Sequence, residues 1–514
     1  MELRGWKCVL GGVSVHLVLG TLYLWSNITT AVTAHLRAFD ETVTYEKTLL
    51  VFATALGVQG CFMLLGGLIE RRFGARKTVL VGGYILTLGT FLASTATSLF
   101  EVMLYNGVFF GVGLGICYTP PITCSMKWLP GRKGFVTGCI VAGFGFGAFV
   151  FGFIATKLVN PNGESIPKGE TGSRGFFAPD SDVAKRVPRM FIVLGCCYFC
   201  LVSFAGWCLQ EPTEVEELEI QQQGGILENT PGPDRAWATV SLNDSSTGGS
   251  SSSMNEPVLP VAARQGYNPL FLGGSYQTDS HTQGSGGKSL ENDTSALSRS
   301  GIPPPGSKTL SSFEVSPAEL VCLPLAWHLS SCLIFTTVGG MYLAGTFKTY
   351  GLEDFPTDES FLSTVASLSS IFNAGGRIFW GALADRFGAV QTCTFMALGF
   401  ALVIYSYPAS SFWGGREGFG CWTFLVFFFE GGNFALYPSI CTNLFGVKNS
   451  GANYAVVFWP YSVCVVINIV LLAHNSVSFD DACLAMGVLT FAGFANLLLL
   501  QNHIRNVACK PRAE

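Results

Sequence analysis

Charged residues are scarce in this sequence. Asp, Glu, Lys and Arg make up 12% of its 514 residues, about half of what soluble domains carry. Hydrophobic residues account for 49%, and many of them gather in runs of about 20, the length that spans a bilayer. This composition excludes a soluble globular domain, and a net charge of −4 gives no basic surface for nucleic acid. The sequence therefore predicts an integral membrane protein surrounded by a lipid bilayer.

Motifs for catalysis, nucleotides and metals are also missing. No Gly-x-x-x-x-Gly-Lys-Ser/Thr loop is present, which argues against direct use of ATP, and no catalytic constellation is found. The 17 cysteines are scattered. Cys197 and Cys200 form a C-x-x-C within an apolar run, which we interpret as small apolar packing rather than a metal or redox site. We expect no enzyme, no cofactor and no metal centre.

Apolar segments of spanning length occur twelve times, with one long interruption. The interruption, 211–317, is rich in Ser, Gly and Pro, so it is predicted to be a disordered linker. It separates an N-terminal six-helix half, 1–210, from a C-terminal six-helix half, 318–514. The predicted spans are 6–27, 48–69, 78–98, 101–124, 134–158, 189–210, 320–346, 360–384, 389–409, 418–440, 450–473 and 480–502.

Lys and Arg are unevenly distributed over the predicted loops. With the N-terminus inside, fourteen of them lie on that side and four in the opposite short loops, although the loop 159–188 runs against the trend. Basic residues gather in cytosolic loops, so both termini and the linker are predicted to be cytosolic. The plasma membrane and an organelle membrane both stay open.

Two similar stretches stand about three hundred residues apart, GLIERRFGARK at 67–77 and NAGGRIFWGALADRFG at 373–388. Both place Phe-Gly-Ala between two apolar segments. The Gly-x-x-x-Asp-Arg-x-Gly ending of the second resembles the loop signature of the major facilitator superfamily. The resemblance implies an all-α membrane protein with twelve transmembrane helices in two pseudo-symmetric six-helix halves, the major facilitator fold. It also implies a site between the halves that is exposed to each side in turn.

The repeated loops are expected to form a gate on the cytosolic side. In the first copy Arg71 stands at the position of Asp385, and the acid, Glu70, comes one residue early, which puts the first-half gate geometry in doubt. The candidate gate residues are Glu70, Arg71, Arg72, Asp385 and Arg386.

A narrower resemblance, to the oxalate/formate antiporter family, covers essentially all twelve spans. It is carried by LGTLYLWS at 19–26, WLPGRKG at 128–134, AGFGFG at 142–147 and GGNFALYPS at 431–439, together with the 373–388 stretch. Monocarboxylate porters are close relatives of that family and share an arginine at the position of Arg377. The order and spacing of these motifs together are specific, although each alone is only moderately so.

The resemblance implies a set of substrate-binding residues. In the oxalate carriers the pocket holds an arginine in helix eight, a lysine in helix eleven and several aromatic residues. Arg377 matches the arginine, Tyr23 and Tyr118 match two aromatic residues, and Gln59 lies at a polar position in helix two. A charged arginine at bilayer depth is costly, about 2.5–3.5 kcal/mol, and normally serves a ligand or a partner.

Three positions depart from the oxalate carriers. The lysine position falls on Tyr461, a pocket tryptophan on Glu430 and a pocket tyrosine on Phe434. The pocket then has a formal charge of zero with Glu430 ionised and +1 with Glu430 protonated, so an oxalate dianion should bind poorly. A monoanion carried with a proton fits better, with its carboxylate held bidentately by the arginine and the proton taken up by Glu430. A zwitterion with its ammonium on Glu430 fits as well.

The prediction is therefore a secondary transporter of small organic anions, most of all monocarboxylates such as lactate, pyruvate or formate, by proton symport or anion exchange. His16 is a further candidate for proton coupling, with an interhelical hydrogen bond as the competing interpretation. Arg377 could instead be a structural partner of Glu430, and the tyrosines could be packing residues. A carrier of amino acids or a non-transporting receptor or scaffold stay open as alternatives. By family analogy the chain is expected to act as a monomer.

Overall fold

The computed structural model describes residues 2–164, 175–220, 314–355, 359–472 and 478–508, and their regular structure is helical. The first half holds α1 (Glu2–Leu19), η1 (Gly20–Leu24), α2 (Trp25–Arg37), α3 (Tyr45–Phe73), α4 (Ala75–Ala93), α5 (Leu99–Val102), η2 (Met103–Phe109), α6 (Phe110–Tyr118), α7 (Pro120–Trp128), η3 (Pro130–Arg132), α8 (Lys133–Val159) and α9 (Asp182–Cys208). The second half holds α12 (Pro317–Cys322), α13 (Pro324–Asp354), α14 (Glu359–Phe387), α15 (Ala389–Ser406), η5 (Tyr407–Ala409), α16 (Ser410–Phe445), α17 (Ser450–Leu472) and α18 (Phe479–Ala508).

Each predicted span coincides with one helix or with one run of consecutive helices. Within the described residues, eight stretches are long and apolar enough to cross a membrane, and one of them, 389–445, contains both α15 and α16. Helix α14 is long enough, but Asn373, Arg377 and several serines lower its hydropathy. Polarity within a spanning helix is expected where it faces the interior of the bundle rather than lipid.

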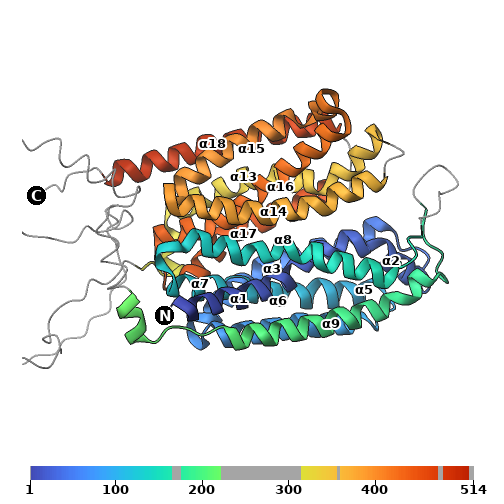
Figure 1. Ribbon diagram of the computed structural model, residues 1–514, viewed down its shortest axis with the longest axis horizontal. Coiled ribbons are helices and arrows are strands. Elements are labelled where there is room, and N and C mark those ends of the chain that lie inside the picture. The colour runs from blue at the N-terminus through green and yellow to red at the C-terminus, as the bar shows by residue number, and fades with distance from the viewer. Residues whose placement is uncertain (1, 165–174, 221–313, 356–358, 473–477, 509–514) are drawn as a thin grey trace, which may run out of the picture.

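The two halves repeat one packing scheme. In the first half, α1 packs on α8, α3 on α6 and α4 on α9, and the corresponding pairs in the second half are α13 with α17, α14 with α16 and α15 with α18. The start of α1 and the end of α18 lie at the same end of the bundle (Figure 1), which we call the terminal end and which the sequence predicts to be cytosolic. The pseudo-symmetric all-α fold predicted from the sequence is confirmed.

Glycines let the two halves approach closely along two helix pairs, α8 with α14 and α3 with α17. A Cβ at Gly134 of α8 would overlap the carbonyl oxygen of Gly381, and one at Gly138 would overlap that of Arg377. On the other pair, Gly67 of α3 lies against the backbone of Ala452 in α17. Small residues allow such close backbone packing in membranes, and α8 and α14 run side by side in Figure 1.

The Phe-Gly-Ala repeat ends a helix in both copies. Gly74, between α3 and α4, has φ 84°, and Gly388, between α14 and α15, has φ 91°. Residues with a side chain rarely adopt such angles, so glycine allows both turns at the terminal end.

Of the predicted linker, 221–313 lies outside the described residues, so its predicted disorder stays a prediction. Its two ends contact the bundle. Glu211 accepts a hydrogen bond from the amide of Ala75 at 2.9 Å, at the start of α4. Glu314 accepts from the amides of Val447 and Lys448 at 3.1 and 2.9 Å. Each end therefore holds a loop at the terminal end of its own half.

Candidate functional site

Arg377 lies where the two halves meet. Its side chain is 2% exposed. Nε donates to Oδ1 of Asn373, one turn earlier on α14, at 2.9 Å, and Nη1 donates to the carbonyl oxygen of Val141 on α8 at 2.9 Å. None of the described residues accepts a hydrogen bond from Nη2. The predicted burial of a charged arginine deep in the bundle is confirmed.

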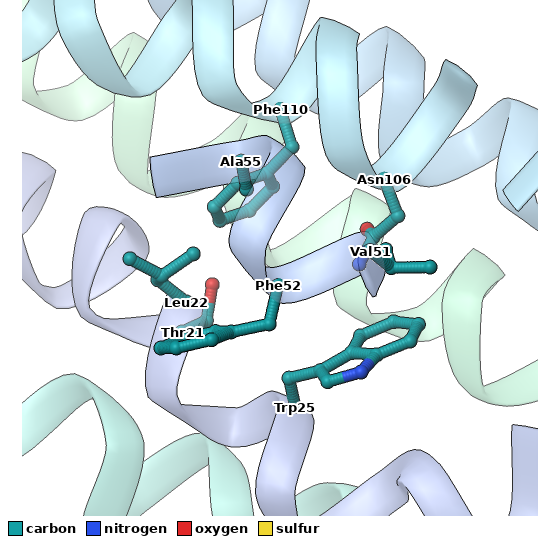
Figure 2. Close-up of a pocket in the computed structure, with 8 residues that line it drawn as sticks. All are labelled: Thr21, Leu22, Trp25, Val51, Phe52, Ala55, Asn106 and Phe110. Carbon is teal, nitrogen blue, oxygen red and sulfur yellow. The ribbon is translucent and has the colours of Figure 1, made fainter. Parts of the chain in front are cut away.

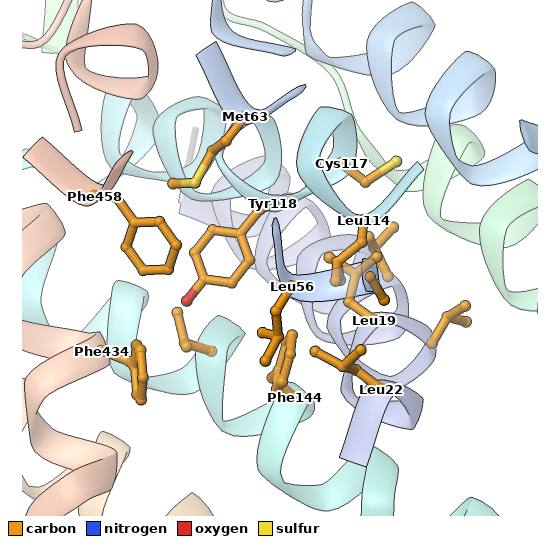
Figure 3. Packing of buried hydrophobic residues seen from close by; sticks show 14 of the residues in the cluster. Leu19, Leu22, Leu56, Met63, Leu114, Cys117, Tyr118, Phe144, Phe434 and Phe458 are labelled. Atoms are coloured by element: carbon orange, nitrogen blue, oxygen red, sulfur yellow. The ribbon is translucent and has the colours of Figure 1, made fainter. Parts of the chain in front are cut away.

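Aromatic rings from both halves surround this guanidinium. Its Cζ lies 5.5 Å from the ring centre of Phe144 on α8 and 5.1 Å from that of Phe434 on α16. Tyr118 of α6 lies next to them, with its ring 6.2 Å from Phe458 of α17. In Figure 3 the hydroxyl of Tyr118 points toward Phe434 and Phe458. Cation–π contacts stabilise a buried guanidinium only partly, and no acidic side chain among the described residues forms an ion pair with it.

The other predicted pocket tyrosines pack against rings of the same aromatic cluster. Tyr23, on the 3-10 segment η1, packs edge-on against Phe144 at 5.5 Å, and its hydroxyl lies 3.8 Å from the sulfur of Met341 in the other half. Tyr461 packs against Phe434 at 6.0 Å. Gln59 is 3% exposed. It directly precedes Gly60, which packs against Ser462 of α17. Phe144, Phe458 and Met341 were not predicted, although Phe144 lies within the AGFGFG motif.

Glu430 does not pair with Arg377. Its carboxyl is 3% exposed and lies inside the second half, where a Cβ on Gly340 of α13 would overlap Oε2. Asn433 donates to Oε2 at 3.5 Å and to the carbonyl oxygen of Thr336 at 3.0 Å, and Oε1 has no partner among the described residues. The direct Arg377–Glu430 pair that the sequence left open is absent from the described residues. The carboxyl turns toward α13 instead, because Gly340 has no Cβ and leaves room for it there.

His16 is fully buried on α1. Its Nδ1 lies 3.0 Å from the carbonyl oxygen of Gly12, and because a carbonyl can only accept, Nδ1 carries the proton. Nε2 has no partner within the described structure, and the ring lies 5.3 Å from that of Tyr118. The hydrogen bond is made within α1, so the interhelical bond that competed with a proton role is not formed by Nδ1.

The second-half gate acid bridges the two halves. Asp385 accepts hydrogen bonds from the amides of Gly134 at 2.6 Å and Phe135 at 2.7 Å, which are the first turn of α8. A carboxylate at a helix N-terminus satisfies free amides and interacts favourably with the helix dipole. This contact therefore holds α14 to α8 at the terminal end.

The first-half gate acid occupies the equivalent place. Glu70 is buried and accepts a hydrogen bond from the hydroxyl of Thr123, and its Oε2 lies beside Gly451 in the first turn of α17. The early position of the acid thus still brings it to the opposite half. Within the described structure the predicted gate arginines form no ion pair, and their gate role stays a prediction. They are the exposed residues Arg71, Arg72 and Arg386.

Two small cavities of about 10 Å³ each accompany the site. One lies within the first half between η1, α3 and η2, lined by Trp25, Phe52 and Asn106 among others (Figure 2). The other lies between the halves near Glu70. A cavity of this size holds at most one water molecule, so neither is a substrate pocket in the present conformation.

Helices that cross a membrane in two related halves, with one buried cation between them, define a membrane carrier. The sequence profile of the Major Facilitator Superfamily matches residues 17–467, and the chain belongs to this family. It is accordingly a multi-pass membrane protein and a secondary transporter, not an enzyme.

Three known proteins illustrate the similarity. Apicoplast pyruvate carrier 1 of Toxoplasma gondii is 25% identical over 507 residues, covering 88% of this chain and 81% of that protein. The oxalate:formate antiporter of Oxalobacter formigenes is 28% identical over 146 residues, covering 28% of this chain and 34% of that protein. Monocarboxylate transporter 13 of Bos taurus is 29% identical over 123 residues, covering 24% of this chain and 28% of that protein. The resemblance to both families is confirmed as a distant similarity over part of the chain.

The fold is also that of a solved transporter. The structure of the proton:xylose symporter XylE superposes with a TM-score of 0.60 at 14% identity, over 96% of this chain and 95% of that one. At this identity the likeness concerns the fold alone.

Proposed function

We propose that this chain carries a small monocarboxylate, such as pyruvate, lactate or formate, by proton symport or anion exchange. The observation that carries the proposal is Arg377, a buried cation at the contact of the halves with no acidic partner among the described residues. A buried charge without a counter-charge is strongly unfavourable. A substrate carboxylate that accepts from Nη2 would supply it.

The charge of the site favours a monoanion. Tyr461 stands where the oxalate carriers have a lysine, so Arg377 is the one cation of the proposed pocket within the described structure. One guanidinium balances one carboxylate, and rings of Phe144, Phe434 and Tyr118 leave an apolar environment for a short carbon chain. The similarity to a pyruvate carrier supports the same substrate class.

Glu430 is proposed as the residue that takes up the coupling proton. Its carboxyl is buried, Oε1 has no described partner, and four residues along α16 Phe434 packs on Arg377. Protonation would remove a buried negative charge close to the substrate site. The zwitterion alternative is less favoured, because the carboxyl turns toward Gly340 rather than toward the guanidinium.

Alternating access is proposed to depend on the contacts at the terminal end. Asp385 of α14, which accepts from the first turn of α8, and Glu70 of α3, which lies beside α17, both reach across the contact of the halves. Breaking them would open that end, and re-forming them would close it.

Counterflow into proteoliposomes tests the substrate proposal. Labelled formate, lactate, pyruvate, oxalate and neutral amino acids are offered at two pH values to the wild type and to Arg377→Gln. We expect monocarboxylate uptake that rises at low pH and is lost in Arg377→Gln, but not in the control Arg186→Gln, whose arginine pairs with Asp182 at the surface. Strong oxalate exchange, or amino-acid uptake alone, would contradict the proposal.

A further inference from the structure

The cavity near Glu70 lies between the two halves at the terminal end. It is lined by residues of α7, α16 and α17 and by Thr119, which lies between α6 and α7, and we call it the gate cavity. Its volume is about 10 Å³, close to the lower limit for one water molecule. The polar residues of its lining are Thr119, Thr123, Thr442, Ser450 and Tyr454.

Three hydroxyls that line this one cavity have no hydrogen-bond partner. Thr119 Oγ1, Ser450 Oγ and Tyr454 OH are all buried, with side chains 2%, 3% and 2% exposed, and none of them has a partner in the described structure. Buried polar groups are nearly always paired, with protein atoms or with ordered water. Three orphans around one cavity of water size indicate that a shared partner belongs there.

Glu70 lies directly beside two residues of the cavity lining, Thr123, which donates a hydrogen bond to its carboxylate, and Gly451. A Cβ built on Gly451 would stand 3.0 Å from Oε2 of Glu70 and 3.0 Å from Oγ1 of Thr119. The space next to Gly451 is therefore within hydrogen-bonding reach of the Glu70 carboxylate on α3 and of the Thr119 hydroxyl between α6 and α7. Ser450, the first residue of α17, lines it from the opposite half.

The Asp385 contact of the second half differs from the Glu70 contact of the first half in its hydrogen bonds to backbone amides. Asp385 accepts directly from two amides of α8, whereas Glu70 accepts from no amide of α17 among the described hydrogen bonds. Both acids stand at the first turn of a helix from the other half, where free amides attract an acceptor. A small hydrogen-bonding molecule in the gate cavity would give the first half a comparable hydrogen-bonded contact.

We propose that the gate cavity binds one water molecule, which joins the Glu70 carboxylate to the hydroxyls of Thr119 and Ser450. The first-half gate contact is then water-mediated, and the second-half contact through Asp385 is direct. A bridging water is nearly as favourable as a direct hydrogen bond, and it also supplies the partner for Tyr454. This inference rests on the gate part of the proposed function, not on the identity of the substrate.

Thr119→Val distinguishes a water-filled cavity from a dry one, because it should change the stability of the first-half contact in opposite directions in the two cases. In a dry cavity the substitution removes an unpartnered buried hydroxyl at nearly constant volume, which should stabilise the contact or leave it unchanged. With water bound, it removes one of the partners of that water, and the contact weakens. Thr119→Ser keeps the hydroxyl and should behave like the wild type.

The readout is amide hydrogen exchange of the full chain in lipid nanodiscs, without substrate, at residues 122–123, whose amides bond to the carbonyl oxygen of Thr119, and at residues 450–454. We expect exchange about tenfold faster in Thr119→Val and in Gly451→Ala, whose methyl group takes the place of the water. Thr119→Ser and Gly345→Ala, a helical glycine with nothing within 4 Å, should match the wild type.

The proposal is overturned if Thr119→Val exchanges no faster than the wild type, or if Thr119→Ser and Thr119→Val behave alike. Unchanged exchange in Gly451→Ala would also overturn it, because a methyl group would then fill a space that was empty. Since no substrate is present, a failed counterflow assay leaves this test intact.

Discussion

Replacing Arg377 by lysine keeps the charge of the site and removes the fork of the guanidinium. Lysine cannot reproduce both the hydrogen bond from Nε to Asn373 and the bond from Nη1 to the carbonyl oxygen of Val141, each 2.9 Å long. Its flexible ammonium is also not held in one direction, whereas a planar guanidinium presents several N–H groups at once. The substitution therefore tests position and geometry separately from charge.

The size of the effect follows from the bonds that are lost. A hydrogen bond to a charged group contributes about 1.5–3 kcal/mol, and 1.4 kcal/mol is a factor of ten. Losing one bond to the substrate carboxylate should lower kcat/KM by about 10–100-fold, mainly through a higher KM. Arg377→Gln removes the counter-charge as well and should leave no measurable monocarboxylate uptake.

The assay is counterflow of labelled pyruvate in proteoliposomes, with equal amounts of inserted protein. Arg186→Lys is the matched control, since its arginine pairs with Asp182 at the surface. Wild-type kinetics in Arg377→Lys would refute the role of the fork. Wild-type uptake in Arg377→Gln would refute the carboxylate site altogether.

Four further substitutions test the coupling and the gate. Asp385→Asn weakens two bonds across the halves, and amide exchange at the start of α8 should rise about tenfold or more; unchanged exchange would contradict the gate role. Glu430→Gln should abolish the pH dependence of uptake, whereas a KM raised equally at every pH would favour a zwitterion. Gly340→Ala forces the Glu430 carboxyl to move and should reduce low-pH stimulation, with Gly345→Ala unchanged in the same assay. Glu314→Ala removes the acceptor for two amides of the α16–α17 loop, and exchange of that loop should rise while α4 keeps its wild-type rate.

The helices of this protein could be predicted because a bilayer imposes a simple rule on each spanning segment. Apolar runs of sufficient length placed all twelve spans, and the repeated Phe-Gly-Ala placed the turns at Gly74 and Gly388, where the backbone has positive φ. The 3-10 segment η1 and the π-helical segment η2 could not be predicted. Such irregular turns depend on the helices packed against them, which the local sequence does not specify.

The site could be predicted by position but not by side-chain direction. The resemblance to the oxalate carriers placed Arg377, Tyr118 and Phe434 in one pocket. In the structure the Arg377 guanidinium lies over the ring of Phe434, and the hydroxyl of Tyr118 points toward Phe434 (Figure 3). Glu430 was placed in the same pocket, yet its carboxyl points into the second half. That direction is set by Gly340, about ninety residues earlier on another helix, and no pattern within α16 reveals it.

Helix α14 links the proposed substrate site to the proposed gate through its contact with α8. Arg377 donates to the carbonyl oxygen of Val141, and Asp385 accepts from the amides of Gly134 and Phe135. Both bonds join the same two helices, so a rocking motion that separates α8 from α14 at the terminal end strains both. A carboxylate bound bidentately to Nη1 and Nη2 of Arg377 would compete with the carbonyl oxygen of Val141 for Nη1 and so weaken the Arg377–Val141 bond. Substrate binding would thereby lower the cost of opening the terminal end, a coupling that needs no movement within either half.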